Sequence, residues 1–344
     1  MNNRFRWQQI TLRHPYLFAL LLLVITLALN FSFQSNLFQR ATLNSNMRVM
    51  LPAILLAVGQ AVVILGGGID ISVGSTVSIT NAILATQLGR EASPEQTALI
   101  TALVLLVGIG AGALNGMFVA VLRLQPIITT YATGFLYGGI ALFILPSPGG
   151  GIPAPISAFY RDTTPLGLPL TFFIILALLL AWALIRRTRF GRYLFAVGGS
   201  AGAAYETGVP VNSIQFSTYV ISGFMAALAG VALTLLTNAG NAAIGEGMTL
   251  PSITAVVLGG AALSGGTGGI AGAILGAIIL GLIRNIISFA DVDLWWQTFV
   301  NAAIIVLALA LPGFVGLIRR NLALRRSRVL REGQAVLGGP STGD

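Results

Sequence analysis

Apolar stretches of about membrane-spanning length follow one another along almost the whole chain. A helix needs about 20 mostly apolar residues to cross the hydrocarbon core of a bilayer. Ten such stretches can be delimited, of which the third and the eighth are short or rich in glycine and polar residues: 16–33, 47–65, 70–88, 97–122, 127–145, 168–185, 215–237, 251–264, 268–289 and 297–317. The repetition predicts an all-α integral membrane protein with about ten transmembrane helices.

The balance of polar and apolar residues also points to a lipid solvent. Charged residues make up 8% of the 344 residues, and hydrophobic residues 56%, whereas soluble domains carry about 25% charged residues. A chain with so little charge cannot cover its apolar surface in water. We therefore expect the lipid bilayer to be its surroundings along most of its length.

Three residue types that carry chemistry are missing or nearly missing. The chain has no cysteine and no lysine, and His14 is its single histidine. These absences exclude thiolate and histidine-cluster metal sites, a P-loop of the GxxxxGK[ST] kind and a lysine Schiff base. These absences disfavour a membrane enzyme, and any ATP that drives the protein must be bound by a separate chain.

The arginines predict the orientation in the membrane. The net charge of +9 comes from residues near helix ends, a pattern that the positive-inside rule explains and that does not indicate a nucleic-acid partner. With the N-terminus in the cytoplasm and ten crossings, 14 of the 19 basic residues lie inside, Arg284 lies within the ninth stretch near its outer end, and four lie outside: Arg40, Arg48, Arg90 and Arg161. Both termini are thus predicted to be cytoplasmic.

This orientation divides the chain into three parts. Residues 1–15 form a cytoplasmic N-terminal segment, residues 16–318 the transmembrane domain with a long cytoplasmic loop at 186–214, and residues 319–344 a cytoplasmic tail. The expected location is the plasma (inner) membrane of a bacterium.

The segment GGGIDISVGS, Gly66 to Ser75, predicts an interrupted helix. Consecutive glycines weaken a helix by about 1 kcal/mol each, and an intramembrane aspartate is costly unless it faces protein or water. Two interpretations stay open: the break lines the solute pathway, or Asp70 and Ser72 cap the following helix near 71–73 and act as a cap or gate hinge. Two amide side chains within predicted spans, Asn81 and Asn115, are added to the residues of this segment. The pathway or gate candidates are thus Gly66, Gly67, Gly68, Asp70, Ser72, Asn81 and Asn115.

A second glycine-rich segment follows the eighth stretch. AVVLGGAALSGG, Ala255 to Gly266, is similar to AVVILGGGIDISVGS, Ala61 to Ser75, since in both a β-branched run enters a glycine cluster. The similarity suggests an internal repeat. We interpret LGGAALSGGTGG, Leu258 to Gly269, as a close-packed helix break, partner to the one at Gly66, and not as a dinucleotide loop, because no βαβ unit surrounds it.

The loop after the sixth stretch is longer than a simple connection requires. Within it, Ala201 to Thr207 can form a short helix that Ser200 caps and Gly208 ends. A small, alanine-faced helix of this kind is suited to docking in a groove of another protein. The alternative is a plain connecting loop.

At these residues the sequence resembles a known family. GGGIDISVGS resembles the GGIDLSVGS signature of ABC-importer permeases for ribose and related sugars. RTRFGRYLFAVGGSAGAAYETGV resembles the loop of the same family, in which AxGGNxxAAxxxGI follows a threonine-arginine-phenylalanine-glycine stretch, and AVVLGGAALSGGTGGIAGAILGAIILGLI resembles its late glycine-rich block. The resemblance covers roughly residues 45 to 318. The tryptophan pair before the last stretch is similar to galactofuranose-type members.

The resemblance implies a mechanism and partners. Two permease subunits, identical or paralogous, would form the pathway, a separate ABC ATPase pair would hydrolyse ATP, and an extracytoplasmic binding protein would deliver a pentose or hexose. The loop helix would match the family's coupling helix, although Ser200 replaces the usual asparagine and Gly202 stands where permeases of other families have glutamate. The ATPase-coupling candidates are Gly198, Gly199, Ala203, Ala204, Glu206 and Gly208.

Other functions remain as alternatives. Branched-chain amino acid and nucleoside permeases are relatives of the same family, so these solutes compete with sugars. An ion-coupled secondary transporter usually places several ionisable groups at mid-membrane, where this chain offers only Asp70 and Arg284.

Overall fold

The structure, a computed structural model, describes residues 16–290 and the single positions 293, 296, 299, 302, 303, 306 and 307. The chain divides into two compact units, Met1–Asp293 and Leu294–Asp344, and every helix named below belongs to the first. The predicted segments 1–15 and 319–344 lie outside the described residues, as does almost all of the predicted helix at 297–317.

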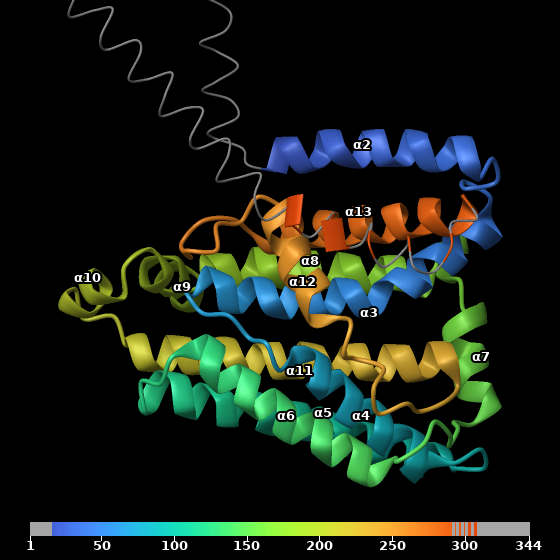
Figure 1. The fold of residues 1–344 in the computed structure, drawn as a ribbon, viewed down its shortest axis with the longest axis horizontal. Coiled ribbons are helices and arrows are strands. Elements are labelled where there is room, and N and C mark those ends of the chain that lie inside the picture. The colour runs from blue at the N-terminus through green and yellow to red at the C-terminus, as the bar shows by residue number, and fades with distance from the viewer. Residues whose placement is uncertain are drawn as a thin grey trace, which may run out of the picture. The chain divides into compact units, whose positions relative to one another are not determined.

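Twelve α-helices and no strand occupy residues 16–290, apart from an isolated bridge between Gly149 and Gly240. Figure 1 shows their arrangement. A π-helical turn, η1 (Met117–Val121), extends α5, and a 3-10 turn, η2 (Pro165–Gly167), precedes α8. The helices are α2 (Tyr16–Phe33), α3 (Arg40–Leu65), α4 (Val73–Leu88), α5 (Pro94–Gly116), α6 (Pro126–Ile144), α7 (Ala154–Asp162), α8 (Leu170–Arg187), α9 (Arg189–Gly199), α10 (Ala201–Glu206), α11 (Val211–Thr237), α12 (Thr249–Leu258) and α13 (Ile270–Phe289).

The all-helical membrane fold is confirmed among the described residues. Among the described residues, six helices are long and apolar enough to span a bilayer, namely α3, α5 with η1, α6, α8, α11 and α13. The predicted stretch 251–264 was too long, because α12 ends at Leu258 and a glycine-rich loop replaces its second half. The stretch 70–88 begins as a helix only at Val73.

Proline and capping residues account for several helix starts. Pro94 stands at the first position of α5, and the Ser93 side chain accepts a hydrogen bond from the Gln96 amide at 3.2 Å. Pro126 opens α6 in the same position. Proline is favoured there because its fixed φ suits a helix and the missing N–H would lack a helical partner.

Helix α11 occupies the middle of the first unit, between α3 on one side and α4 and α5 on the other (Figure 1). A Cβ at Gly112 would overlap the carbonyl oxygen of Tyr219, and one at Gly116 would lie 2.9 Å from that of Phe216. Gly112 and Gly116, four residues apart, therefore allow close backbone packing where α5 crosses α11.

The four arginines predicted to lie outside come together around one connecting segment. The Arg48 guanidinium donates to the Arg161 carbonyl at 2.9 Å, Arg90 contacts Gly151, and Arg40 contacts Gly167. The Tyr160 hydroxyl donates to the Arg48 carbonyl at 3.4 Å, and burial raises the pKa of Tyr160. These contacts hold α7 against the start of α3 and place the four arginines on one side of the unit.

Candidate functional site

The predicted helix interruption lies between α3 and α4. Gly66 ends α3, and Gly67 takes φ +83°, a left-handed conformation that glycine adopts without strain. A Cβ at Gly68 would lie 2.5 Å from the hydroxyl of Tyr219 on α11. The glycines thus turn the chain out of the helix and let it pass close to α11, so the break itself is confirmed.

Asp70 lies in the break and is buried, with 1% of its surface exposed. One carboxylate oxygen accepts hydrogen bonds from the Ser72 amide at 3.0 Å and the Ser72 hydroxyl at 2.7 Å. The other accepts from the Ser222 hydroxyl of α11 at 2.9 Å. Asp70 therefore stabilises the turn that leads into α4 and ties that turn to α11, whereas Ser72, at the N-cap position, makes no side-chain capping hydrogen bond.

The hydrogen bonds continue from Ser72 into two further helices. The Asn115 amide group of α5 donates to the Ser72 hydroxyl at 2.8 Å, and the Thr133 hydroxyl of α6 donates to the Asn115 carbonyl oxygen at 2.6 Å. With Asp70 and Ser222, these residues form what we term the Asp70 network. It joins four helices through buried polar groups, each of which has a partner.

Asn81 belongs to a separate cluster nearer the other end of α4. Its side-chain NH₂ donates to the Thr234 hydroxyl at 2.7 Å, and its oxygen accepts from the Asn241 amide at 2.8 Å. Asn81 thus fixes the chain that follows α11. Asp70, Ser72, Asn81 and Asn115 are all buried inside the subunit, and none lines either of the two cavities described below.

An open groove of about 640 Å³ lies between α4, α6 and the segment 242–250. The sequence prediction missed its lining. Ser75 and Ser78 of α4 share one helix face with Ile71, Tyr131 and Phe135 form an edge-on aromatic pair at 4.8 Å, and Glu246 is the charged residue at its rim. The signal was present: Ile71, Ser75 and Ser78 have helical spacing, and Gly134, Gly138 and Gly139 leave α6 without side chains there.

The predicted short helix in the loop 186–214 is α10, Ala201–Glu206. The Ser200 side chain caps it by accepting from the Ala203 amide at 3.3 Å, and Gly208, with φ +80°, ends it. Ala204 is buried against the subunit, whereas Ala201, Gly202, Ala203, Tyr205 and Glu206 are exposed. The exposed, small-residue side of α10 is the surface that a partner can contact.

Three glycine turns meet directly beside this loop. Gly66 and Gly67 end α3, Gly198 and Gly199 end α9, and Gly265 and Gly266 lie between α12 and α13; we term them the glycine junction. The Gly266 amide donates to the Leu65 carbonyl at 3.2 Å, and a Cβ on Gly198 would overlap that same carbonyl oxygen. Backbone thus packs on backbone, and the interpretation of Leu258–Gly269 as a break paired with the one at Gly66 is confirmed.

The two similar segments also end their helices in the same way. The Gly68 amide bonds to the Val63 carbonyl across the end of α3, and the Ala261 amide bonds to the Val256 carbonyl across the end of α12. The glycine before each donor, Gly67 or Gly260, has positive φ. This is the Schellman geometry in both places. Duplication of the whole subunit stays a prediction.

We expect Asp70→Asn to lower solute uptake several-fold while membrane abundance falls less. An asparagine offers one acceptor where the carboxylate serves three donors, and an unsatisfied buried group costs about 1–3 kcal/mol. Uptake by cells, normalised to permease quantified by immunoblot, measures this. Asp162→Asn, an exposed carboxylate at the end of α7, is the control. A loss of abundance that fully accounts for lost uptake would make the role of Asp70 structural only.

Comparison with known proteins gives a consistent result. Residues 42–309 match the family described as branched-chain amino acid transport system / permease component. The ribose import permease protein RbsC of Escherichia coli K12 is 35% identical over 300 residues, 85% of this chain and 90% of the relative. RbsC of Bacillus subtilis 168 is 32% identical over 308 residues, 86% and 91% of the two chains.

A second group of relatives is named for a different solute. The autoinducer 2 import system permease protein LsrC of Salmonella choleraesuis is 34% identical over 281 residues, 79% of this chain and 77% of the relative. No solved structure is significantly similar to the chain.

Proposed function

This chain belongs to the family of permease components of branched-chain amino acid transport systems, and from that premise we propose that it forms half of the pathway through which an ABC importer takes up a sugar. It is a multi-pass membrane permease in the branch that contains the ribose and autoinducer 2 import permeases. It is a transport component and not an enzyme, it holds no cofactor, and the ATPase of such a system is a separate chain.

The observation that carries the sugar proposal is the similarity to RbsC over 85% of the chain. The groove chemistry agrees with it. Ser75 and Tyr131 offer hydroxyl groups, Phe135 offers an apolar ring face, and Glu246 offers a carboxylate acceptor. A neutral polyol can use all of these groups, and no basic residue lines the groove in the described part of the chain to pair with the carboxylate of an amino acid.

We propose that the groove is one wall of the pathway and that a second permease subunit closes it. Glu246, Tyr131 and Phe135 are exposed along an open side of the groove. Polar groups at membrane depth must face protein or water and not acyl chains. A second copy or a paralogue packed against α6 would provide that cover. The Asp70 network would then hold the wall from behind, with the candidates Gly66–Gly68, Asp70, Ser72 and Asn115 acting as gate support and Asn81 as an anchor.

The orientation and partners follow from the same proposal. The N-terminal segment 1–15, the loop 186–214 and the tail 319–344 lie in the cytoplasm, and a tenth crossing completes the domain 16–318. The exposed side of α10 docks in the ABC ATPase, with Ala203 and Glu206 in contact and with Gly198, Gly199, Ala204 and Gly208 shaping the loop. An extracytoplasmic sugar-binding protein docks at the arginine-rich opposite side.

A bulky side chain in the groove is expected to block transport. Gly138→Leu fills space beside Ser75, whose hydroxyl lies 3.8 Å from where a Cβ would be; we expect uptake to fall about tenfold at unchanged abundance. Gly110→Leu, on an exposed part of α5 with nothing within 4 Å, is the control. Radiolabelled sugar uptake measures both. Equal uptake by the two variants would show that solute passes elsewhere.

The solute class is tested by competition. Cells that carry the complete importer are given labelled D-ribose with an excess of unlabelled pentose, hexose, leucine or nucleoside. Competition by sugars alone supports the proposal. Competition by leucine or by nucleosides would favour the alternatives that the family also includes.

A further inference from the structure

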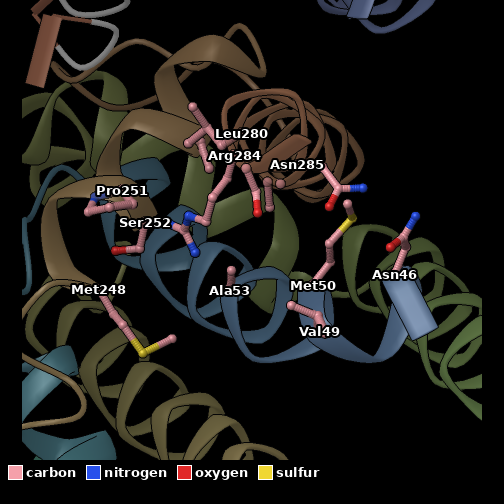
Figure 2. Close-up of a pocket in the computed structure, with 14 residues that line it drawn as sticks. Asn46, Val49, Met50, Ala53, Met248, Pro251, Ser252, Leu280, Arg284 and Asn285 are labelled. Carbon is pink, nitrogen blue, oxygen red and sulfur yellow. The ribbon is translucent and has the colours of Figure 1, made fainter. Parts of the chain in front are cut away.

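A second cavity lies between α3, α12 and α13 (Figure 2), and its lining has no residue in common with that of the groove. Its volume is about 260 Å³. The lining comes from residues 46–53 near the start of α3, 248–255 at the start of α12 and 277–288 in the second half of α13. The opposite ends of these helices adjoin the glycine junction. The cavity is therefore on the side of the four arginines that are predicted to face outward.

Arg284 supplies the charge of this cavity. Its side chain reaches from α13 toward Ser252 of α12 (Figure 2). No ion pair joins it to any residue within 16–290, and none of the residues that line the cavity is acidic. A guanidinium on a membrane-spanning helix is unfavourable without a counter-charge. The cavity therefore has the electrostatics of an anion site.

A second donor in the lining has no partner. The Asn46 side-chain nitrogen is buried and makes no hydrogen bond. By contrast, Asn285 donates to the Gln34 side-chain oxygen at 3.3 Å, and the Ser252 hydroxyl donates to the Thr249 carbonyl at 2.6 Å. Arg284 and Asn46 thus both have donors to spare, but Figure 2 places Asn46 on the far side of the cavity from the Arg284 guanidinium, so an oxyanion beside Ser252 accepts from Arg284.

The rest of the cavity wall is apolar. Met50 and Ala53 of α3 face Ala277 and Leu280 of α13, and α3 and α13 are both helices of membrane-spanning length. A small soluble anion would gain nothing from such a wall. A ligand that joins an oxyanion to apolar chains would use both parts of the lining.

We propose that this cavity binds the phosphate group of an anionic phospholipid, with Arg284 as the donor and the acyl chains lying along α3 and α13. The volume accommodates the phosphate and glycerol portion, and the chains remain in the surrounding bilayer. The lining has no residue in common with the groove or with the ATPase-docking helix, so we expect lipid there to act on the stability of the permease.

The test compares thermal unfolding of the purified full-length permease in detergent micelles that contain phosphatidylglycerol or phosphatidylcholine. We expect phosphatidylglycerol to raise the Tm of the wild type by several degrees, and to raise that of Arg161→Gln, an exposed arginine of α7 outside the cavity, equally. Arg284→Gln should lose the shift. Ser252→Asp keeps the arginine and places a carboxylate beside it, so this variant should also lose the shift, and it serves if Arg284→Gln does not fold.

Native mass spectrometry supplies a second readout. We expect phosphatidylglycerol to stay bound to the wild type and to leave Arg284→Gln. A full Tm shift in Arg284→Gln and in Ser252→Asp would overturn the proposal. An equal shift of the wild type with inorganic phosphate or glycerol phosphate would overturn the assignment to a lipid and leave a site for a soluble oxyanion.

Discussion

Replacing Gly198 with alanine is expected to reduce solute uptake and the amount of folded permease by about tenfold or more. Over-packing a core costs about 1–3 kcal/mol, and the cost lies at or above the upper end of this range where the overlapping atoms belong to the backbone. The added methyl group would overlap the carbonyl oxygen of Leu65 and lie 2.6 Å from the Gly266 amide nitrogen. Neither atom can rotate away, because both belong to the backbone of the glycine junction. The turn of α3 and the α12–α13 loop would have to separate.

The neighbouring glycine provides a matched control. A Cβ on Gly199 would meet nothing within 4 Å, and Gly199 is exposed. Gly199→Ala should therefore give as much folded permease as the wild type. Fluorescence-detected size-exclusion chromatography measures folded permease, and labelled sugar uptake measures transport. Wild-type behaviour of Gly198→Ala would mean that the junction is not packed as the structure describes.

Replacing Ala203 with tryptophan is the second large expected effect, and it should act on coupling alone. Ala203 lies on the exposed side of α10, so a large side chain can be accommodated in the permease but not in a closely fitted ATPase groove. We expect uptake to fall about tenfold or more, while the Tm changes by no more than about 2 °C, as is usual for surface substitutions within ±0.5 kcal/mol.

Ala204 distinguishes docking from folding. It is 5% exposed and packs against the subunit, so Ala204→Trp should lower the Tm as well as uptake. Binding-protein-stimulated ATP hydrolysis and co-purification of the ATPase are measured for both variants. Normal transport by Ala203→Trp would remove α10 from the docking surface, and a lowered Tm for that variant would make its effect structural.

The sequence predicted well those features that depend on local chemistry. Ser200 and Gly208 delimit α10 because capping and left-handed turns depend on a few adjacent residues. The breaks at Gly66 and Gly259 were predicted for the same reason. Apolar length identified the spans, but the end of α12 at Leu258 was missed because the apolar run continues into the glycine loop.

The sequence predicted less well those features that depend on three-dimensional neighbours. Asp70 and Asn115 stand out in an apolar sequence, yet their hydrogen bonds to Ser222 and Thr133 are long-range and make them interior supports of the helices. Glu246 was not predicted as a site residue because it lies in a loop between spans. Its place beside α4 and α6 results from tertiary packing, which no local pattern encodes. The role of each predicted pathway residue remains a prediction.

The most direct test of the account is reconstitution in proteoliposomes. The permease is incorporated alone, or with its ABC ATPase and with the binding protein on the opposite side, and sugar accumulation is followed with ATP or with a proton or sodium gradient as the energy source. We predict accumulation only when ATPase, binding protein and ATP are all present. Accumulation by this chain alone, driven by an ion gradient, would contradict the account.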